Sequence, residues 1–373
     1  MSSIKQLARP HLHHFEPYSS ARDEFTNDAQ VRELVYLDAN ENPFGPQRIL
    51  EQMTSRGDAF HQIQSALSLA NRYPDPHQKS LRQAIARLKG VLPSEVFVGN
   101  GSDEAIELLI KIFCEPGKDF VVSCPPTYGM YQVSAKSNAV ALKHCPLQKD
   151  FSLDLEALGE IAKDPHAKLL FLCSPNNPTG QLVPLDQIER VAKFFPGIVV
   201  VDEAYIDFAP SSASALNQIS KLSNLVVLQT LSKAWGLAAL RVGIAFANKE
   251  IIELIDSIKQ PYNVNGLSQQ IALYALTQAD DKESQVGMIC KERDRVLNIL
   301  QRTKCVLHAF PSSANFLLVR FDDGPATYRY LLEKGIIVRD RSSQLYCDNC
   351  LRITIGTPDE NDALVAALGG LQS

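Results

Sequence analysis

Lys233 is the residue of this sequence whose surroundings most clearly allow chemistry. It lies in 230-TLSKAWGLAALRVG-243, with Arg241 eight residues later, and the segment 199-VVVDEAY-205 places the carboxylate of Asp202 at the end of an apolar run. A primary amine attacks a carbonyl carbon when it is held near an electron-accepting group, and separate residues must grip the partner molecule. The segment therefore indicates amine–carbonyl chemistry, provided that distant residues gather around the lysine.

An expected helix start in 99-GNGSDEAIELLIKIF-113 offers a place for an anion. Gly101 allows a ligand to approach the backbone closely, and the hydroxyl of Ser102 can cap the helix. Free backbone amides at such a start, together with the helix dipole, suit a phosphate group. The same residues also fit a well-capped helix that carries Asp103 in its first turn and binds nothing, so both interpretations stay open here.

Two further polar side chains follow or end apolar runs. Asn177, in 174-SPNNPTG-180, could donate a hydrogen bond to an oxygen on a cofactor ring, although simple turn chemistry also explains it. Asp202 ends a nearly apolar strand, where a carboxylate is costly unless it meets a cation such as a protonated ring nitrogen. A helix cap or a buried ion pair is the alternative for Asp202.

An aromatic ring and several phosphate-compatible groups complete the candidates. Tyr128, in 124-CPPTYGMY-131, could stack on a flat heteroaromatic ring, whereas core packing is the commoner role of a tyrosine. Thr230, Ser232 and Arg241 supply two hydroxyls and a cation around Lys233, and such groups bind phosphate. As isolated residues they would more often be surface groups.

These residues need a scaffold that brings them together, and the sequence predicts one. Short β-branched runs alternate with helical patterns from about residue 96 to 246, which is typical of a mostly parallel, doubly wound α/β sheet. The expected strands are 96–98, 120–123, 139–144, 168–173, 198–202, 225–229 and 242–247. Ligands of such sheets bind beyond the carboxyl ends of the strands. Four of the candidate residues lie there: Ser102, Asn177, Asp202 and Lys233.

The length of the chain predicts two domains. A strand, helix, strand pattern over 315–321, 325–335 and 351–356 follows a long helical stretch at 266–303, and indicates a smaller α+β domain. Proline and asparagine punctuate the first residues, as in 40-NENPFGP-46, which favours an arm over a separate core. The predicted division is an N-terminal arm over 1–47, a large domain over 48–264 and a small domain over 265–373.

Composition limits the classes of partner. Of the 373 residues, 45% are hydrophobic and 21% charged, as in ordinary globular proteins. The formal net charge is -5, and no basic run resembles a nucleic-acid or membrane-binding patch. No apolar run approaches the roughly 18 residues of a membrane-spanning helix, and residues 1–14 lack the apolar core of a signal peptide. We therefore expect a cytoplasmic protein with small-molecule partners.

The sequence gives little reason to expect a metal. Eight scattered cysteines favour reduced thiols over a disulfide framework. Cys347 and Cys350 form a C-x-x-C without a second pair, so a plain loop is the preferred interpretation. His11, His13 and His14 lie in the expected arm without a carboxylate beside them, and we interpret them as solvated.

Together the motifs resemble the fold-type I pyridoxal-phosphate-dependent aminotransferases, and in detail the histidinol-phosphate aminotransferase branch of that family. The matching segments extend along nearly the whole chain: 17-PYSSAR-22, 37-LDANENP-43, 73-YPDP-76, 99-GNGSDEAIE-107, 125-PPTYGMY-131, 174-SPNNPTG-180, 202-DEAY-205, 230-TLSKAWGLAALRVG-243, 337-IVRD-340 and 351-LRITIGT-357. The resemblance implies an α/β fold with a mostly parallel seven-stranded sheet in the large domain and a smaller α+β domain. It also implies pyridoxal 5'-phosphate as the cofactor.

The resemblance implies a role for each matching residue. Lys233 would form the Schiff base with the cofactor, Asp202 would meet the pyridine nitrogen, and Tyr205 would join these two as a catalytic residue. Asn177 and Tyr205 would contact the ring oxygen, and Tyr128 would stack on the ring. The cofactor phosphate would be held by Ser102, Asp103, Thr230, Ser232 and Arg241, and by Tyr73 from the second subunit of a homodimer with shared active sites.

On the substrate side, the resemblance implies that Arg352 and Arg339 grip a phosphate or a carboxylate, and that Tyr18 and Asn40 line the site. Two arginines suit a dianionic phosphate through forked hydrogen bonds. The alternative is a pair of exposed arginines at strand ends. The loop 341-RSSQLYCDNC-350 has no predicted role.

The implied reaction is transamination between L-histidinol phosphate and 2-oxoglutarate, run in the direction that consumes glutamate during histidine biosynthesis. Amino-acid phosphate decarboxylases and aromatic or broad-specificity aminotransferases share most of these motifs, so both alternatives stay open. A non-catalytic regulator that binds the same cofactor would need a DNA-binding helical module with a basic face, and the sequence contains no such pattern.

Overall fold

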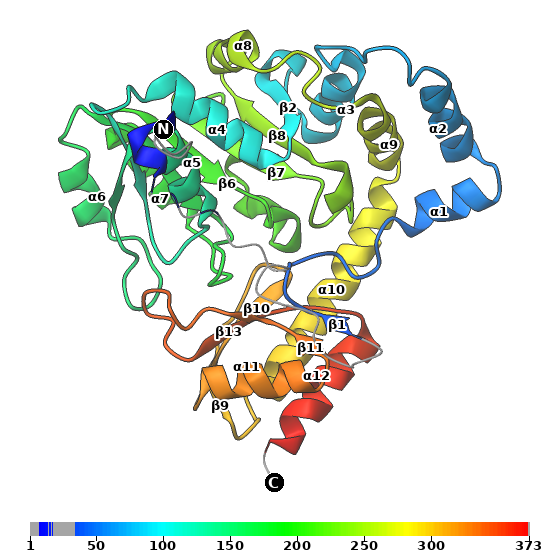
Figure 1. Ribbon diagram of the computed structural model, residues 1–373, viewed down its shortest axis with the longest axis vertical. Helices are drawn as coiled ribbons and strands as arrows, with labels where there is room; N and C mark the ends of the chain where they lie inside the picture. Colours follow the sequence, from blue (N-terminus) through cyan, green and yellow to red (C-terminus); the bar gives the residue numbers. More distant parts are fainter. Residues whose placement is uncertain (1–6, 14, 16, 18–33, 372–373) are drawn as a thin grey trace.

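A seven-stranded sheet forms the centre of the larger part of the molecule (Figure 1). The computed structural model describes residues 7–13, 15, 17 and 34–371. The strands, in their order across the sheet, are β2 (Val96–Asn100), β8 (Val242–Ala247), β7 (Leu225–Thr230), β6 (Ile198–Asp202), β5 (Ala167–Cys173), β3 (Phe120–Ser123) and β4 (Ala141–His144). Their bounds agree with the predicted runs to within two residues, and the mostly parallel α/β fold is confirmed.

Alternation along the strands explains how both faces of this sheet are covered. Neighbouring residues such as Phe97 and Val98 are both fully buried but belong to different hydrophobic cores, because successive side chains point to opposite faces. One face packs against α3 (Lys79–Lys89), α6 (Leu155–Ile161), α7 (Leu185–Phe194) and α9 (Gly266–Leu276). The other packs against α4 (Ser102–Phe113), α5 (Met130–Ser137) and α8 (Lys249–Ile258).

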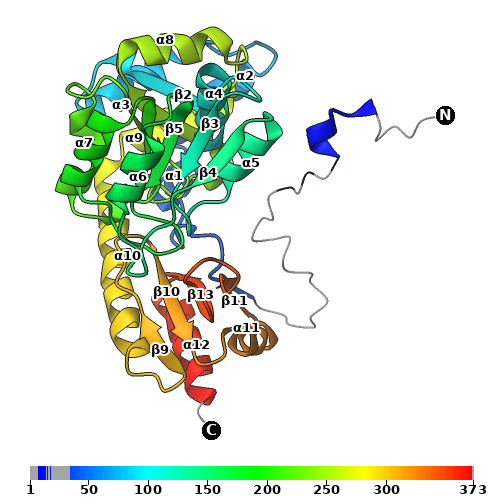
Figure 2. The ribbon, with the colours of Figure 1, turned by 90° about the vertical axis from the view of Figure 1, so that its left-hand side faces the viewer.

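A second, smaller sheet lies below the first and is joined to it by the long helix α10 (Ala279–Leu300), which runs along one side of the molecule (Figure 2). Its order is β12 (Arg339–Asp340), β13 (Cys350–Thr354), β10 (Phe316–Phe321) and β9 (Val306–Ala309). The helices α11 (Gly324–Glu333) and α12 (Pro358–Gly370) pack against it. A short parallel pair, β1 (Val35–Tyr36) and β11 (Ile336–Ile337), joins the N-terminal segment that precedes the large sheet in sequence to the smaller part.

The helical stretch expected over 266–303 is interrupted, and this part of the prediction is wrong. Gln278 leaves helical geometry, with φ −107° and ψ 40°, so that α9 ends at Leu276 and α10 starts at Ala279. The break lets the two helices serve different cores: α9 packs against α2 (Asp58–Ser68) and α3, whereas the far end of α10 packs under the small sheet. The hydrophobic pattern alone does not reveal such a division. The domain limits at 47 and 264 stay a prediction.

The first residues of the large part form two helices at its outer side, α1 (Gln47–Thr54) and α2. Within the described ranges, no helix combines the length and apolar character required to cross a membrane.

Candidate active site

A cavity of about 280 Å³ opens where the carboxyl ends of the parallel strands face the small sheet. β8 runs antiparallel to its neighbours β2 and β7, so it begins at the edge where they end. Arg241, the residue before β8, therefore lies near the carboxyl ends of β2 and β7. Most predicted site residues line this cavity: Asn40, Ser102, Asp103, Tyr128, Asn177, Asp202, Tyr205, Thr230, Ser232, Lys233, Arg241, Arg339 and Arg352. Topology therefore gathers residues that lie up to about 300 positions apart in the sequence.

The amine of Lys233 is held at the centre of the cavity. The residue follows β7 in a tight turn, and its Nζ donates to the carbonyl oxygen of Ala39 at 2.8 Å. Burial lowers the pKa of Lys233 to about 8, and the positive charge of Arg352 acts in the same direction. The amine is therefore much closer to neutrality at physiological pH than an exposed lysine, as a nucleophile or proton acceptor requires.

Asp202 provides a buried carboxylate on the other side of the cavity. Its Oδ2 accepts from the hydroxyl of Tyr131 at 2.8 Å, and its Oδ1 accepts from the amide of Ala204 at 3.1 Å. Burial raises the pKa of Asp202 to about 6, although both hydrogen bonds oppose the shift. A buried carboxylate of this kind is stabilised when a cation meets it.

Tyr131 is a site residue that the sequence analysis missed. It is fully buried, its ring stacks on Phe171 at 4.6 Å between centroids, and it faces Asp202 from α5. The segment 125-PPTYGMY-131 contains both tyrosines, but only Tyr128 was singled out, because a spacing of three residues at a helix start does not reveal which hydroxyl meets a carboxylate.

Glycines shape the anion-binding turn between β2 and α4. Gly101 has φ +82°, and its amide donates to the carbonyl oxygen of Arg241 at 2.7 Å. A Cβ on Gly243 would lie 2.1 Å from both Gly101 C and Ser102 N, so only glycine lets β8 approach the turn this closely. The expected cap by Ser102 is wrong: Gly101 is the N-cap, Ser102 is the first helical residue, and its side chain makes no cap hydrogen bond. The Ser102 hydroxyl lines the cavity instead.

The other phosphate-compatible groups converge on the same turn. The hydroxyl of Thr230 donates to that of Ser232 at 3.0 Å, and both residues are buried. Arg241, with φ +54°, lies 3.4 Å from the carboxylate of Asp103, which also accepts from the Tyr128 hydroxyl at 3.1 Å. Two hydroxyls, a guanidinium and a helix start at one place fit a phosphate group.

A hydrogen-bonded group connects the large sheet to the small one above Lys233. Nδ2 of Asn177 lies 3.5 Å from the hydroxyl of Tyr205, which also accepts from Nδ2 of Asn40 at 3.0 Å. Oδ1 of Asn177 accepts from Arg352 at 2.8 Å. Burial raises the pKa of Tyr205, so its hydroxyl stays protonated and can donate to an oxygen of a bound ring. The hydrogen bond from Arg352 to Oδ1 of Asn177 fixes the orientation of that amide, so that its Nδ2 is directed toward the Tyr205 hydroxyl.

Three arginines line the small-domain side of the cavity. Arg339 and Arg352 are directly paired across β12 and β13 and are both buried, so they lie on the same face of the sheet. Arg341, two residues after Arg339, continues this pairing through its amide and lines the same cavity. Arg341 could not be predicted as a site residue because it opens the loop 341–350, whose course no local pattern predicts.

Two predicted residues lie elsewhere. Tyr73 is 80% exposed, lines no part of the cavity, and stacks on Tyr262 with ring centroids 4.5 Å apart. Tyr18 lies outside the described residues. The C-x-x-C cysteines are free and buried: Cys347 lies in the loop after Arg341, and Cys350 begins β13. In the described part of the chain, no group of three or more acidic, cysteine or histidine side chains is placed to hold a metal ion.

The charged side chains that line the cavity indicate what kind of ligand it can bind. Five cationic side chains line it, Lys233, Arg241, Arg339, Arg341 and Arg352, against three carboxylates, Glu41, Asp103 and Asp202. The arginines lie at two ends, with Arg241 by the helix start and the other three by the small sheet. Such a site suits a ligand with one phosphate at the first end, a flat cationic ring beside Asp202, and an anionic substrate at the second end.

Comparison with known proteins agrees with this arrangement. The family model described as aminotransferase class I and II matches residues 32–368. A histidinol-phosphate aminotransferase of Parabacteroides distasonis is 47% identical, with 100% of both chains covered, and one of Cytophaga hutchinsonii is 46% identical, with 98% of both covered.

The chain belongs to the class I and II aminotransferases, in the histidinol-phosphate aminotransferase family. A solved histidinol-phosphate aminotransferase from Sinorhizobium meliloti, in complex with pyridoxal-5'-phosphate, has the same fold: the TM-score is 0.85, at 25% identity over 97% of this chain and 96% of the other. The resemblance inferred from the motifs is thus confirmed, as is the fold of this aminotransferase family.

Proposed function

We propose that this aminotransferase uses pyridoxal 5'-phosphate to transfer an amino group between glutamate and the oxo precursor of L-histidinol phosphate. The observation that carries the proposal is that Lys233, the buried carboxylate of Asp202 and the helix start after Gly101 line one cavity. When bound, the cofactor supplies an aldehyde carbon that takes up amines and a ring that accepts electrons. The residues of this chain determine where it sits and how protons move.

The large domain would hold the cofactor. Ser102, Asp103, Thr230, Ser232 and Arg241 surround the place for its phosphate. Asp202 would meet the ring nitrogen, which keeps that nitrogen protonated and the ring electron-poor. Tyr128 would lie against the ring face, and Asn177 and Tyr205 would donate to the ring oxygen.

Lys233 would act twice, first as the amine that tethers the cofactor and then as the base. An incoming amino substrate would displace Nζ from the cofactor, and the freed neutral amine would take a proton from the substrate carbon that bears the nitrogen and give it to the aldehyde-derived carbon of the cofactor. The low pKa of Lys233, about 8, keeps a usable fraction of Nζ neutral. The carbonyl oxygen of Ala39 holds Nζ in place before it is displaced.

The small domain would select the substrate. Arg339 and Arg352 present two guanidinium groups on one face of the sheet, with Arg341 beside them. Guanidinium groups bind phosphate oxygens in pairs, so this end suits the dianionic phosphate of histidinol phosphate. The carboxylate of 2-oxoglutarate or glutamate would use the same arginines, and Asn40 would line the space between them and Lys233.

The natural direction would consume glutamate and form L-histidinol phosphate for histidine biosynthesis, in the cytoplasm. The assembly we propose is a homodimer, in which Tyr73 reaches the phosphate of the partner's cofactor. Its high exposure and its distance from the cavity of its own chain support this assignment.

The test is a steady-state comparison of histidinol phosphate with phenylalanine, tyrosine and aspartate, using 2-oxoglutarate as the acceptor. We expect kcat/KM for histidinol phosphate to exceed that for the other donors on the order of 100-fold or more. The other donors carry no phosphate, so they would leave the buried arginines without that partner. Comparable values would make the protein a broad or aromatic aminotransferase. Release of carbon dioxide from an amino-acid phosphate would make it a decarboxylase.

A further inference from the structure

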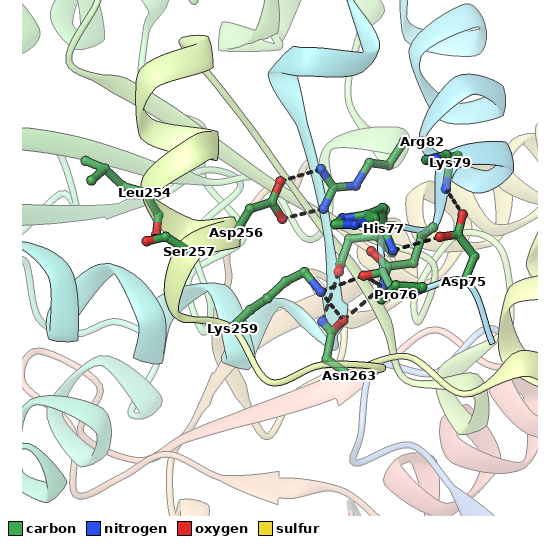
Figure 3. A network of polar contacts seen from close by, with 12 residues as sticks. Asp75, Pro76, His77, Lys79, Arg82, Leu254, Asp256, Ser257, Lys259 and Asn263 are labelled. Atoms are coloured by element: carbon green, nitrogen blue, oxygen red, sulfur yellow. Dashed lines mark hydrogen bonds and ion pairs between the residues drawn. The ribbon is translucent and has the colours of Figure 1, made fainter. Parts of the chain in front are cut away.

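A polar network on the outer side of β2 connects the start of α4 to the turn that carries Tyr73. Figure 3 shows Asn263 beside Lys259, whose Nζ donates to Oδ1 of Asn263 at 3.3 Å and to the carbonyl oxygen of Pro76 at 2.7 Å. None of these residues lines the cavity, and the proposed mechanism does not use them.

Asn263 satisfies the full hydrogen-bonding capacity of its amide group. Nδ2 donates to the carbonyl oxygen of Val98 at 3.1 Å and to Oε2 of Glu104 at 2.9 Å. Oδ1 accepts from Gln78 at 3.0 Å and from Nζ of Lys259 at 3.3 Å. Two donors and two acceptors are all that an asparagine side chain offers, so no other orientation of this amide is equally satisfied.

Glu104 links this amide to the anion-binding turn. It lies in the first turn of α4, and the oxygen that accepts from Asn263 also accepts from the backbone amide of Asn100 at 2.5 Å. The carboxylate lies close over the backbone here, since a Cβ on Gly99 would be 3.0 Å from it. Glu104 thus fixes the backbone just before Gly101, where the chain turns to present the amides of the helix start.

The position of β2 at the edge of the sheet explains what the bonds of Asn263 and Glu104 contribute. Among the residues that the structure describes, β2 is the outermost strand of the sheet and pairs with β8 alone, so its outer side has no neighbouring strand. Asn263 covers this open edge, because its Nδ2 donates to the carbonyl oxygen of Val98 as the amide of a neighbouring strand would. The residue before it, Tyr262, stacks on Tyr73, and Lys259 binds Pro76, so the segment 259–263 holds the Tyr73 turn as well.

We propose that Asn263 and Glu104 are positioning residues for the cofactor phosphate: together they set the position of the amides at the start of α4. This inference rests on the proposed function, because it assigns the anion at this turn as the phosphate of pyridoxal phosphate. Neither side chain contacts the ligand. Their effect is on the geometry of the turn, and a displacement of a binding group by about 1 Å is costly to affinity and rate.

The experiment compares two probes, pyridoxal phosphate and pyridoxal, which lacks the phosphate, by titrating each into the cofactor-free full-length protein and following its visible absorbance. In Asn263→Asp a carboxylate would face the carboxylate of Glu104, and we expect pyridoxal phosphate to bind on the order of 10-fold to 100-fold more weakly. Binding of pyridoxal should change by less than about threefold, because it has no phosphate to misplace.

Two further variants separate positioning from general damage. Glu104→Gln keeps an oxygen that can accept from both Asn100 and Asn263, so its affinity for pyridoxal phosphate should stay close to that of the original protein. The double variant Asn263→Asp with Glu104→Gln removes the like charges and should recover much of the lost affinity. Positioning is indicated when the recovery is confined to pyridoxal phosphate, because general damage to the fold would change the binding of both probes.

The matched control is Asp256→Asn. Asp256 forms a two-point ion pair with Arg82 in the same layer, at 2.6 and 2.7 Å (Figure 3), but neither residue contacts Asn263 or α4 through a described hydrogen bond. This change should lower stability without altering the preference for pyridoxal phosphate over pyridoxal. If the Asn263→Asp protein does not fold, Glu104→Ala, which removes both bonds to the carboxylate, gives the same comparison.

The outcomes are distinct. If the original protein binds no pyridoxal phosphate, the proposed function fails and the inference with it. If the original protein binds it and the Asn263→Asp and Glu104→Ala variants bind it equally well, or lose both probes in equal measure, the inference alone is overturned.

Discussion

At the residue scale, the site works by holding two titratable groups away from their ordinary charge states. Burial lowers the pKa of Lys233 to about 8 and raises the pKa of Asp202 to about 6. The two shifts leave the amine partly neutral and the carboxylate still ionised at neutral pH, which is the combination that amine chemistry on a cationic ring requires.

The pKa of Lys233 predicts how cofactor capture depends on pH. Only the neutral amine attacks the aldehyde, and a lysine is neutral above its pKa, so the rate should rise about tenfold per pH unit below pH 8 and level off above it. Stopped-flow absorbance after mixing cofactor-free protein with pyridoxal phosphate measures this rate. A rate that keeps rising to pH 10 would mean that the amine has the pKa of an exposed lysine.

Tyr131 should matter for Asp202 rather than for the fold. In Tyr131→Phe the ring still stacks on Phe171, but Asp202 loses a hydrogen bond to its ionised form, so its pKa rises above about 6. We expect affinity for pyridoxal phosphate to fall on the order of tenfold at pH 6 and to approach the original value by pH 8, since a protonated carboxyl cannot pair with the ring cation. Parallel affinity profiles across this pH range would contradict the assigned contact.

At the element scale, the site depends on how closely β8 approaches the turn between β2 and α4. The placement of Arg241 follows from the reversal of β8, and the small residues Gly101 and Gly243 permit the contact. Parallel strands on one side and a reversed strand on the other would thus supply groups to the proposed phosphate site.

Gly243→Ala tests this contact. The new Cβ would lie 2.1 Å from the backbone at Gly101 and Ser102, so the turn must move, and affinity for pyridoxal phosphate should drop on the order of 100-fold. Gly159→Ala, in α6, is the control: the new Cβ would meet no other part of the protein within 4 Å beyond its own helix backbone, and the change should stabilise the protein by about 0.5–1 kcal/mol without altering affinity. Unchanged cofactor affinity in Gly243→Ala would show that the turn is not the phosphate site.

The strands of the large sheet and the residues at their ends could be predicted because both follow local rules. Apolar runs of four to seven residues mark buried parallel strands, and functional side chains cluster after them, as Asn177 and Asp202 do. Tyr131, Arg341 and Asn263 were missed because their partners come from other elements. Which hydroxyl meets Asp202, or which amide covers the edge of β2, depends on packing between elements that the local pattern does not encode. The break at Gln278 was missed for the same reason.

At the scale of the whole molecule, the cavity lies between the large and the small sheet, and each sheet contributes a different set of lining residues. The large sheet carries Lys233, Asp202 and the phosphate turn, and the small sheet carries the arginines. Asn177 and Arg352 join the two sides of the cavity by a buried hydrogen bond of 2.8 Å, which would hold the proposed substrate end in place relative to the large sheet.

The proposed sharing of sites between subunits predicts recovery of activity in mixed dimers. Lys233→Ala and Tyr73→Ala should each be nearly inactive alone, but a dimer of one of each has one site with both residues intact, so co-refolded mixtures should regain activity. Mixtures of Lys233→Ala with Asp202→Asn should stay inactive, because both residues belong to the same site of one chain. A Tyr73 mixture no more active than its components would refute the exchange of Tyr73.

The central claim is that Lys233 carries the cofactor covalently, and borohydride reduction tests it most directly. The purified protein, loaded with pyridoxal phosphate and reduced, should lose its visible absorbance and carry one cofactor mass per chain, on the peptide that contains Lys233. Lys233→Ala should fold as the original does and carry none. A cofactor mass on another lysine, or none on the original protein, would contradict the account.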